Sequence, residues 1–189
     1  MPSAHASAQS PVAAASARSF DVSLGYSYTS RFDSSSDHVG LNGVDATISK
    51  PVHSRLQLRA DLGYARAANV FGTSRHSDVL SYLAGPAFYP ITLRHFSVYV
   101  QGLMGGARVT GPILLAEGGF LDGAWVNRFS WAVGGGAEYQ VSDSTTIRTS
   151  VDFLRTAYFE SAQAIRGQSN ITTAASLVHY FGRRSRRGR

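Results

Sequence analysis

The sequence has no cysteine and very few of the residues that normally cover a soluble surface. Charged residues make up 16% of the 189-residue chain, against roughly 25% in a typical soluble domain. Lysine occurs once, as Lys50, and glutamate only as Glu117, Glu138 and Glu160. The lack of cysteine excludes a disulfide framework and a thiolate metal site. The shortage of lysine and glutamate argues against an ordinary water-soluble surface.

Long hydrophobic runs are also missing. No stretch approaches the roughly 18 to 20 apolar residues of a membrane-spanning helix. A closed β-barrel can still span a membrane, because it pairs every backbone N–H and C=O group within itself. The chain is long enough for one domain and short for two.

The two ends differ in composition from the body. Residues 1–19 are rich in alanine and serine, and Ala6-Ser7-Ala8 before Gln9 has the small-x-small form of a signal-peptidase site. We interpret this segment as the remnant of an export signal whose true start lies upstream, with a flexible leader as the alternative. The basic tail, residues 182–189, holds five arginines: Arg183, Arg184, Arg186, Arg187 and Arg189.

Without that tail the body is close to neutral, although the whole chain carries a net charge of +6. We therefore expect no nucleic-acid partner. The tail is expected to be a solvated end, with weak attraction to lipid or peptidoglycan as the alternative.

From Phe20 onward, apolar and polar residues alternate with a period of two, which predicts strands with two unlike faces. Phe20, Val22 and Leu24 alternate with Asp21 and Ser23, for example. The predicted strands are 20–30, 40–50, 55–66, 78–89, 95–108, 128–140, 145–155 and 170–181. These lengths suit tilted membrane strands.

The connections alternate between long and short. The long ones are 31–39, 67–77, 109–127 and 156–169; the short ones, 51–54, 90–94 and 141–144, contain turn residues. An up-and-down meander follows, with the long loops at one end and the short turns and both termini at the other. Outer-membrane barrels show this asymmetry. The predicted fold class is an all-β, eight-stranded antiparallel up-and-down transmembrane β-barrel over 20–181.

One face of these strands is bulky and aromatic, whereas the other carries small residues and a few charges. A polar face exposed to water should hold many lysines and glutamates, so we place the small polar face inside a narrow barrel. Aromatics near strand ends predict interfacial girdles. They are Tyr26, Tyr28, Tyr64, Tyr82, Phe88, Tyr89, Phe96, Phe129, Trp131, Tyr139, Phe153 and Phe181.

Several segments, in their order and spacing, resemble the OmpA-like (OmpX-type) outer-membrane β-barrel family. They are 20–28 (FDVSLGYSY), 84–89 (AGPAFY), 102–107 (GLMGGA), 133–139 (VGGGAEY), 151–156 (VDFLRT) and 178–181 (VHYF). The resemblance implies a bacterial outer-membrane location, outer-membrane lipid as surroundings and the barrel-assembly machinery as a partner during insertion. Members typically end on the aromatic that this machinery reads, whereas here Phe181 is followed by the basic tail. The peptidoglycan-binding domain of larger members is absent from this sequence.

Inward-facing charges form the first candidate site. The predicted lumen charge network comprises Asp45, Arg59, Asp61, Glu138, Arg148 and Asp152. Buried charges must be paired to be tolerated, so we expect an ion-pair network that fills the lumen. A gate, a proton path or a narrow pore is the alternative.

Some eight-stranded outer-membrane barrels are lipid A-modifying enzymes with a Ser/His/acid arrangement. His38 and His76 lie in predicted long-loop regions with serines and acids nearby, namely Ser36, Ser74, Ser77, Asp37 and Asp78. Serine is too common here for such neighbours to be informative, and no Gly-x-Ser-x-Gly signature occurs. We therefore predict that the chain is not an enzyme.

The apolar long loop within 109–127 is the second candidate site, and it contains Ile113, Leu114, Leu115, Phe120, Leu121 and Trp125. It could cover the barrel mouth, meet a second copy or bind a host surface, although strand extension above the membrane explains it equally well. The glycine runs 105–106 and 134–136 lie within strands, which excludes a phosphate-binding loop. We expect a monomeric structural or surface-interaction protein without cofactor or metal. A soluble lipocalin-like carrier is the remote alternative.

Overall fold

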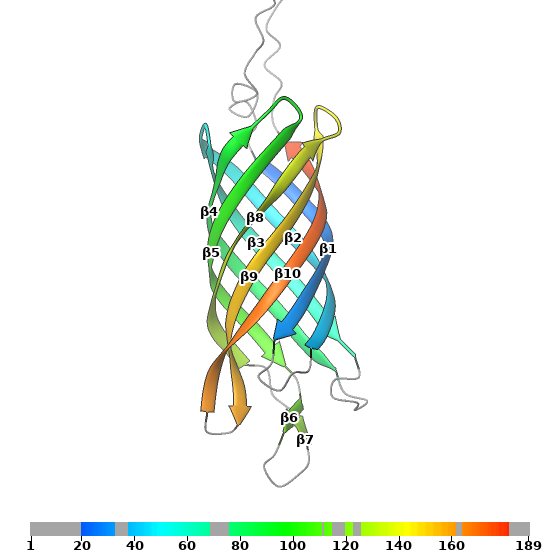
Figure 1. The fold of residues 1–189 in the computed structure, drawn as a ribbon, viewed down its shortest axis with the longest axis vertical. Coiled ribbons are helices and arrows are strands. Elements are labelled where there is room, and N and C mark those ends of the chain that lie inside the picture. Colours follow the sequence, from blue (N-terminus) through cyan, green and yellow to red (C-terminus); the bar gives the residue numbers. More distant parts are fainter. Residues whose placement is uncertain are drawn as a thin grey trace, which may run out of the picture.

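The computed structural model describes residues 20–32, 38–68, 76–110, 112–114, 120–122, 126–161 and 164–181. Eight of its strands form a closed barrel in which every neighbouring pair is antiparallel (Figure 1). These strands are β1 (Phe20–Phe32), β2 (His38–His53), β3 (Leu56–Ala67), β4 (Ser77–Thr92), β5 (Phe96–Thr110), β8 (Val126–Gln140), β9 (Thr145–Ser161) and β10 (Ala164–Phe181). None of the described residues lies in a helix long and apolar enough to cross a membrane.

The barrel closes where its first and last strands meet. β1 pairs with β10 from Phe20↔Phe181 to Phe32↔Ser169, and the rings of Phe20 and Phe181 stack with their centroids 4.9 Å apart. The strand order around the barrel is β1-β10-β9-β8-β5-β4-β3-β2. The predicted fold class is therefore confirmed, including the up-and-down order of the strands.

Several strands run past the predicted turns. Pro51 and Pro90 lie within β2 and β4 rather than in turns, and the ladders shift register between Pro51 and His53 and between Phe88 and Ile91. A bulge lets a strand continue past a proline that cannot donate a hydrogen bond. The predicted turn boundaries were therefore too early.

The predicted loop 156–169 is largely strand, which corrects the sequence-based boundary. β9 and β10 stay paired as far as Ala164↔Ser161, and they extend beyond the other strands at the long-loop end (Figure 1). Two antiparallel strands satisfy each other's backbone groups, so the hairpin continues after its neighbours have ended. In the predicted loop 109–127, β6 (Pro112–Leu114) and β7 (Phe120–Asp122) form a separate two-stranded sheet.

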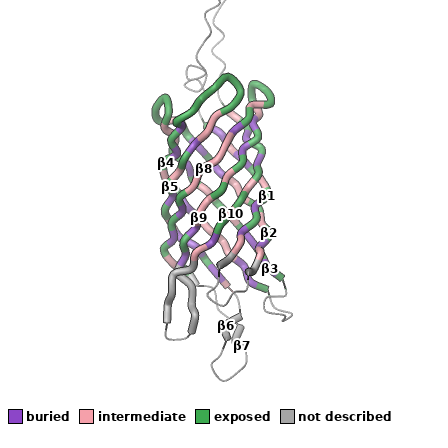
Figure 2. The backbone as a smooth tube through the Cα atoms, viewed as in Figure 1, coloured by how far each residue is buried: buried purple, intermediate pink, exposed green. Residues whose placement is uncertain are grey.

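Alternate residues face opposite sides of the barrel wall, as the buried and exposed positions along each strand show (Figure 2). Asp21, Ser23 and Ser49 are almost completely buried inside. Outside, Leu24 is 66% exposed and Phe129 67% exposed. A water-soluble protein would bury such side chains, whereas a lipid-facing wall needs them outside. The predicted orientation of the two faces is confirmed.

The aromatic residues predicted for the girdles face outward with one clear exception. Phe88 is exposed, but its neighbour Tyr89 is only 6% exposed and points into the lumen. Consecutive residues of a strand face opposite sides, so only one of the two could join an exterior girdle. The prediction for Tyr89 was wrong.

Candidate functional site

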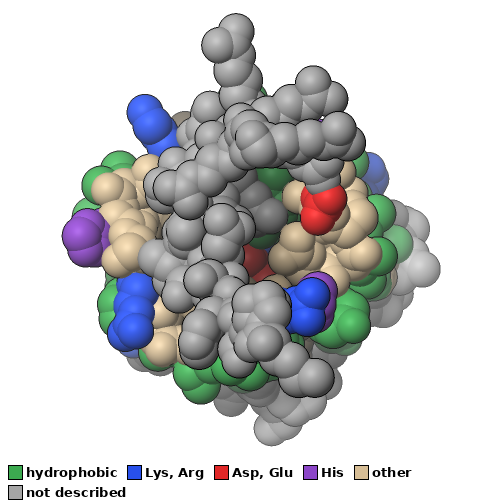
Figure 3. All heavy atoms as spheres, turned by 90° about the horizontal axis from the view of Figure 1, so that it is seen from above, with side chains coloured by type: hydrophobic (Ala, Val, Ile, Leu, Met, Phe, Trp, Pro, Cys, Tyr) green, Lys and Arg blue, Asp and Glu red, His purple; other side chains and the backbone are tan. Residues whose placement is uncertain are grey.

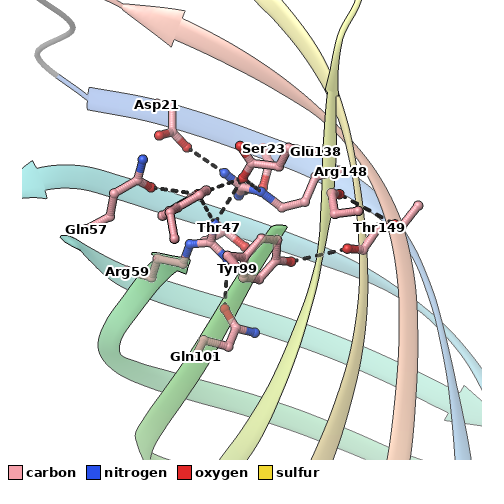
Figure 4. A network of polar contacts seen from close by, with 12 residues as sticks. Asp21, Ser23, Thr47, Gln57, Arg59, Tyr99, Gln101, Glu138, Arg148 and Thr149 are labelled. Atoms are coloured by element: carbon pink, nitrogen blue, oxygen red, sulfur yellow. Dashed lines mark hydrogen bonds and ion pairs between the residues drawn. The ribbon is translucent and has the colours of Figure 1, made fainter. Parts of the chain in front are cut away.

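The most densely connected part of the lumen is a charged cluster near the short-turn end. Asp21 enters it from β1, Arg59 from β3, Glu138 from β8 and Arg148 from β9 (Figure 4). All four side chains occupy inward positions and are at most 5% exposed. The closed ring of strands thus brings together charges that lie up to 127 residues apart in the chain.

Glu138 lies at the centre of this cluster. Its Oε1 accepts hydrogen bonds from Arg148 Nε at 2.8 Å, Arg59 Nη2 at 3.0 Å and the Tyr89 hydroxyl at 2.8 Å. Arg148 Nη2 in turn donates to Asp21 Oδ1 at 3.2 Å. Two arginines therefore face two carboxylates, and the cluster is formally neutral. Buried charges are tolerated when paired and hydrogen-bonded in this way.

Aromatic and amide side chains complete the surroundings of Arg59. Its guanidinium carbon lies 4.0 Å from the centroid of the Tyr99 ring, a cation–π geometry. Its Nη1 donates to Gln101 Oε1 at 2.8 Å and its Nη2 to the Tyr89 hydroxyl at 2.5 Å. Tyr99 itself is 1% exposed. These contacts satisfy both terminal nitrogens of Arg59, whereas its Nε is buried without a hydrogen-bond partner among the described residues.

Gly136 makes room for that aromatic ring. A Cβ at this inward position would clash with the Thr149 carbonyl oxygen and would lie 2.7 Å from the Tyr99 hydroxyl oxygen. The glycine run of β8 therefore allows close packing inside the lumen, consistent with its placement in a strand.

The remaining three members of the predicted network also point inward, but among the described residues none of them forms an ion pair with the charged cluster. Asp61 Oδ2 accepts a hydrogen bond from the Thr47 hydroxyl at 2.9 Å, and Asp152 Oδ1 accepts one from Gln101 Nε2 at 2.7 Å. Asp45 Oδ1 is buried without a hydrogen-bond partner among the described residues. Within the described part of the chain, no ion pair joins these three carboxylates to an arginine.

Sequence reasoning thus placed three of the four charges of the cluster in one set and left Asp21 outside it, although Asp21 lies on the inward face. Tyr89, Tyr99 and Gln101 were missed as well. The alternation of strand residues could have indicated that Tyr89 and Gln101 face inward, because Tyr89 lies two positions from the inward Ala87 and Gln101 two positions from the inward Leu103. Their contact with Arg59 depends on how strands lie across the barrel, which parity does not reveal.

Beyond the charged cluster, part of the lumen is lined by apolar side chains. Leu83, Leu103, Ala132 and Leu154 pack together, each at most 6% exposed. A second buried group follows toward the long-loop end, formed by Leu41, Ala65 and Ala67. Ions cross such layers only with a large desolvation penalty. Buried polar side chains share this half of the lumen, among them Ser27, Thr29 and Asn170. The described lumen therefore holds one ionic cluster, followed by apolar clusters among small polar groups.

The serine–histidine–acid candidates do not assemble into a triad among the described residues. His76 Nε2 lies 3.5 Å from Asp78 Oδ2, and Asp78 also accepts from the Tyr64 hydroxyl at 3.0 Å. Ser77 is fully buried and donates to the Thr110 carbonyl, so its hydroxyl is already engaged. Ser36, Asp37 and Ser74 lie outside the described residues, as does the side chain of His38.

The apolar long loop is described only in part. Ile113 pairs with Leu121 and Leu114 with Phe120 in the β6–β7 sheet, whereas Leu115 and Trp125 lie outside the described residues. The orientation of the paired side chains is also outside the description. Over the described ranges, no group of three or more His, Cys, Asp or Glu residues could hold a metal ion.

No protein-family model matches the chain, and no curated protein matches its sequence. Solved structures do match. The crystal structure of Neisserial surface protein A (NspA) has a TM-score of 0.67 at 14% identity, covering 86% of this chain and 97% of that one. Ail, the attachment invasion locus protein of Yersinia pestis, has a TM-score of 0.61 at 15% identity, with coverages of 87% and 99%. The outer membrane protein OprG from Pseudomonas aeruginosa has a TM-score of 0.53 at 10% identity, with coverages of 88% and 98%.

These similarities span nearly the whole length of each solved chain but remain at low sequence identity, so they establish the fold. The apolar exterior adds a physical reason for a lipid environment, since lipid-facing barrel walls are apolar. Both observations support the predicted bacterial outer-membrane location. The chain thus shares the eight-stranded barrel fold of bacterial outer-membrane proteins.

Proposed function

We propose that this protein is an integral outer-membrane barrel with a closed lumen, which acts as a structural or surface-interaction scaffold rather than as a pore or an enzyme. The observation that carries the proposal is the pair of buried side-chain clusters in the lumen. The ionic cluster around Glu138 and the apolar layer around Leu103 occupy successive levels of the same narrow interior. An eight-stranded barrel has an interior just wide enough for such side chains.

The long-loop end supplies the surface for interaction. The β9–β10 hairpin and the β6–β7 sheet both project beyond the barrel there (Figure 1). Binding residues are often found in loops held by a rigid scaffold. One of the matched proteins, Ail, is an attachment invasion locus protein, and an attachment role at this end is the corresponding proposal for this chain. Membership of the OmpA-like family stays a prediction.

Conductance across a planar lipid bilayer tests the closed lumen. We expect no discrete current steps from the refolded protein, because an ion would have to pass both the buried charged cluster around Glu138 and the buried side chains of Leu83 and Leu103. Discrete current steps in the parent protein, with a different step size in the Glu138→Gln variant, would instead identify a narrow pore controlled by the ionic cluster.

The attachment role needs a separate test. Cells that display the protein should lose adhesion to a host-cell layer when residues 158–166 are replaced by a tight turn, while the barrel stays folded. Unchanged adhesion after that replacement, and after a matching replacement of residues 112–122, would contradict a surface role at this end.

A further inference from the structure

The outer wall of the barrel carries a groove where a proline faces a glycine. Pro86 of β4 lies opposite Gly102 of β5. The ladder between these strands is continuous as far as Ala84↔Met104 and resumes at Ala87↔Gln101. Proline has no N–H to donate and is rare away from sheet edges, and this closed barrel has no edge. Neither residue has a long side chain, so the wall is hollow at this point.

The groove is lined mainly by apolar side chains that face the membrane. Its part nearer the short-turn end is lined by Leu56, Phe88 and Val100. Its part farther from that end is lined by Pro86, Gly102 and Val133. A Cβ added at Gly102 would meet no atom within 4 Å, so the space directly above this glycine in the groove is empty of protein atoms. Neighbouring Leu58 and Met104 are more than half exposed and stand out from the wall beside it.

The rim above this groove is basic. The β2–β3 connection and the end of β2 bring Lys50, His53 and Arg55, and the β4–β5 turn brings Arg94 and His95. All five are exposed. Residues 50–55 and 93–95 contain no aspartate or glutamate. Figure 3, which looks onto this end, shows basic side chains at several points around the rim.

Arg55 links the basic rim to the groove. It immediately precedes Leu56, and its carbonyl oxygen accepts a 2.9 Å hydrogen bond from the Tyr89 N–H, which fixes it beside β4. Within the described part of the chain, none of the ion pairs involves Lys50, Arg55 or Arg94. Basic side chains at a membrane surface attract anionic headgroups, and long ones can reach the interface from an apolar wall.

We propose that this surface is a binding site for one anionic phospholipid of the leaflet at the short-turn end. Arg55 and Arg94 bind the phosphate-containing headgroup, and the groove over Pro86 and Gly102 holds one acyl chain. The charge of the rim selects an anionic lipid, and the groove below it provides a fixed place for the chain. This lipid site depends on the proposed function only in that the barrel must span the outer membrane; it does not depend on a closed lumen or on attachment.

Native mass spectrometry of the full-length refolded protein tests this site. Phosphatidylglycerol and phosphatidylcholine with identical acyl chains serve as the probes. We expect one phosphatidylglycerol to bind more tightly than phosphatidylcholine. The double variant Arg55→Ser/Arg94→Ser should weaken phosphatidylglycerol binding by roughly 25-fold, at about 5-fold per basic residue near a membrane surface. It should weaken phosphatidylcholine binding much less, because the choline cation already neutralises the phosphate of that lipid.

Filling the groove tests the acyl-chain half of the site. Gly102→Phe should weaken the binding of both lipids, whereas Met104→Phe, which adds the same ring at the next outward position of β5, should not. If Gly102→Phe does not fold, Gly102→Leu makes the same test. Arg155→Ser removes an exposed arginine nearer the long-loop end and should have no effect.

Three results would overturn the proposal. They are equal affinity for the two lipids, unchanged binding in Gly102→Phe, and loss of the phosphatidylglycerol preference when the five tail arginines alone are changed to serine. Boiled and unboiled samples of each variant show by their migration whether the barrel has formed. A change in lipid binding can therefore be told apart from failure of the barrel to fold, which migration reveals, and from an open lumen, which conductance reveals.

Discussion

At the scale of single residues, the lumen depends on the pairing of Glu138. This carboxylate accepts hydrogen bonds from both buried arginines and from Tyr89. Without it, the described residues would leave Arg59 with no ion pair and Arg148 with only the one to Asp21. An unpaired buried charge costs far more than a well-paired one. The position therefore matters more to stability than the other inward carboxylates do.

Replacing Glu138 by glutamine should lower the free energy of unfolding by about 3 to 5 kcal/mol, the usual cost of removing one partner of a buried ion pair. Asp152→Asn is the matched control, because the described ion pairs do not include Asp152 and its carboxylate accepts from Gln101. It should cost about 1 kcal/mol, as for one hydrogen bond. Urea unfolding in lipid vesicles, followed by tryptophan fluorescence, measures both. Equal losses in the two variants would show that ion pairing at Glu138 contributes little.

At the scale of elements, the strands divide into a wall and a projection. Residues 146–155 of β9 and 169–179 of β10 pair with both neighbours in the barrel, whereas farther out toward the long-loop end the two strands pair only with each other. An isolated two-stranded hairpin is only marginally stable in water. The outer hairpin therefore contributes little to the stability of the wall.

Replacing residues 158–166 by Asn-Gly, a favoured two-residue hairpin turn, keeps Ala157 opposite Gly167 and should leave the barrel folded. The remaining ladder still includes Thr156↔Gln168 and every β1–β10 pair. Circular dichroism in detergent and the yield of refolded protein give the comparison with the parent chain. A variant that no longer refolds would mean that the projecting hairpin is needed to form the wall.

At the scale of the whole molecule, closure of the sheet sets the properties of the protein. Every barrel strand has two neighbours, so no edge is left with unpaired backbone groups. The charged cluster lies inside, and most of the large apolar side chains face outward. We therefore expect such a molecule to need lipid or detergent to cover its apolar exterior.

The refolded protein should migrate differently on electrophoresis when boiled and when left unboiled, because a closed membrane barrel resists unfolding in detergent. The protein should also be recovered with the membrane fraction. Equal migration, together with solubility in plain buffer, would contradict the membrane orientation and favour a soluble carrier with a ligand inside.

Much of the fold followed from the sequence alone. Alternation fixed the number of strands and their two faces, since the side-chain period of a strand is two wherever the strand lies. The shortage of lysine and glutamate then decided which face meets lipid. Boundaries were less certain. Backbone pairing continues past Pro51 and beyond Leu154 for reasons of hydrogen bonding that side-chain patterns do not record.

Only the tertiary structure decided which inward residues meet. Alternation gives the side that a residue faces but not its height in the barrel, which depends on strand tilt and register. Arg59 therefore reaches Glu138 across the lumen, while the described ion pairs include none between Asp45 and either buried arginine. The groove between Pro86 and Gly102 arises in the same way, because two residues 16 positions apart become opposite only when β4 and β5 pair in this register.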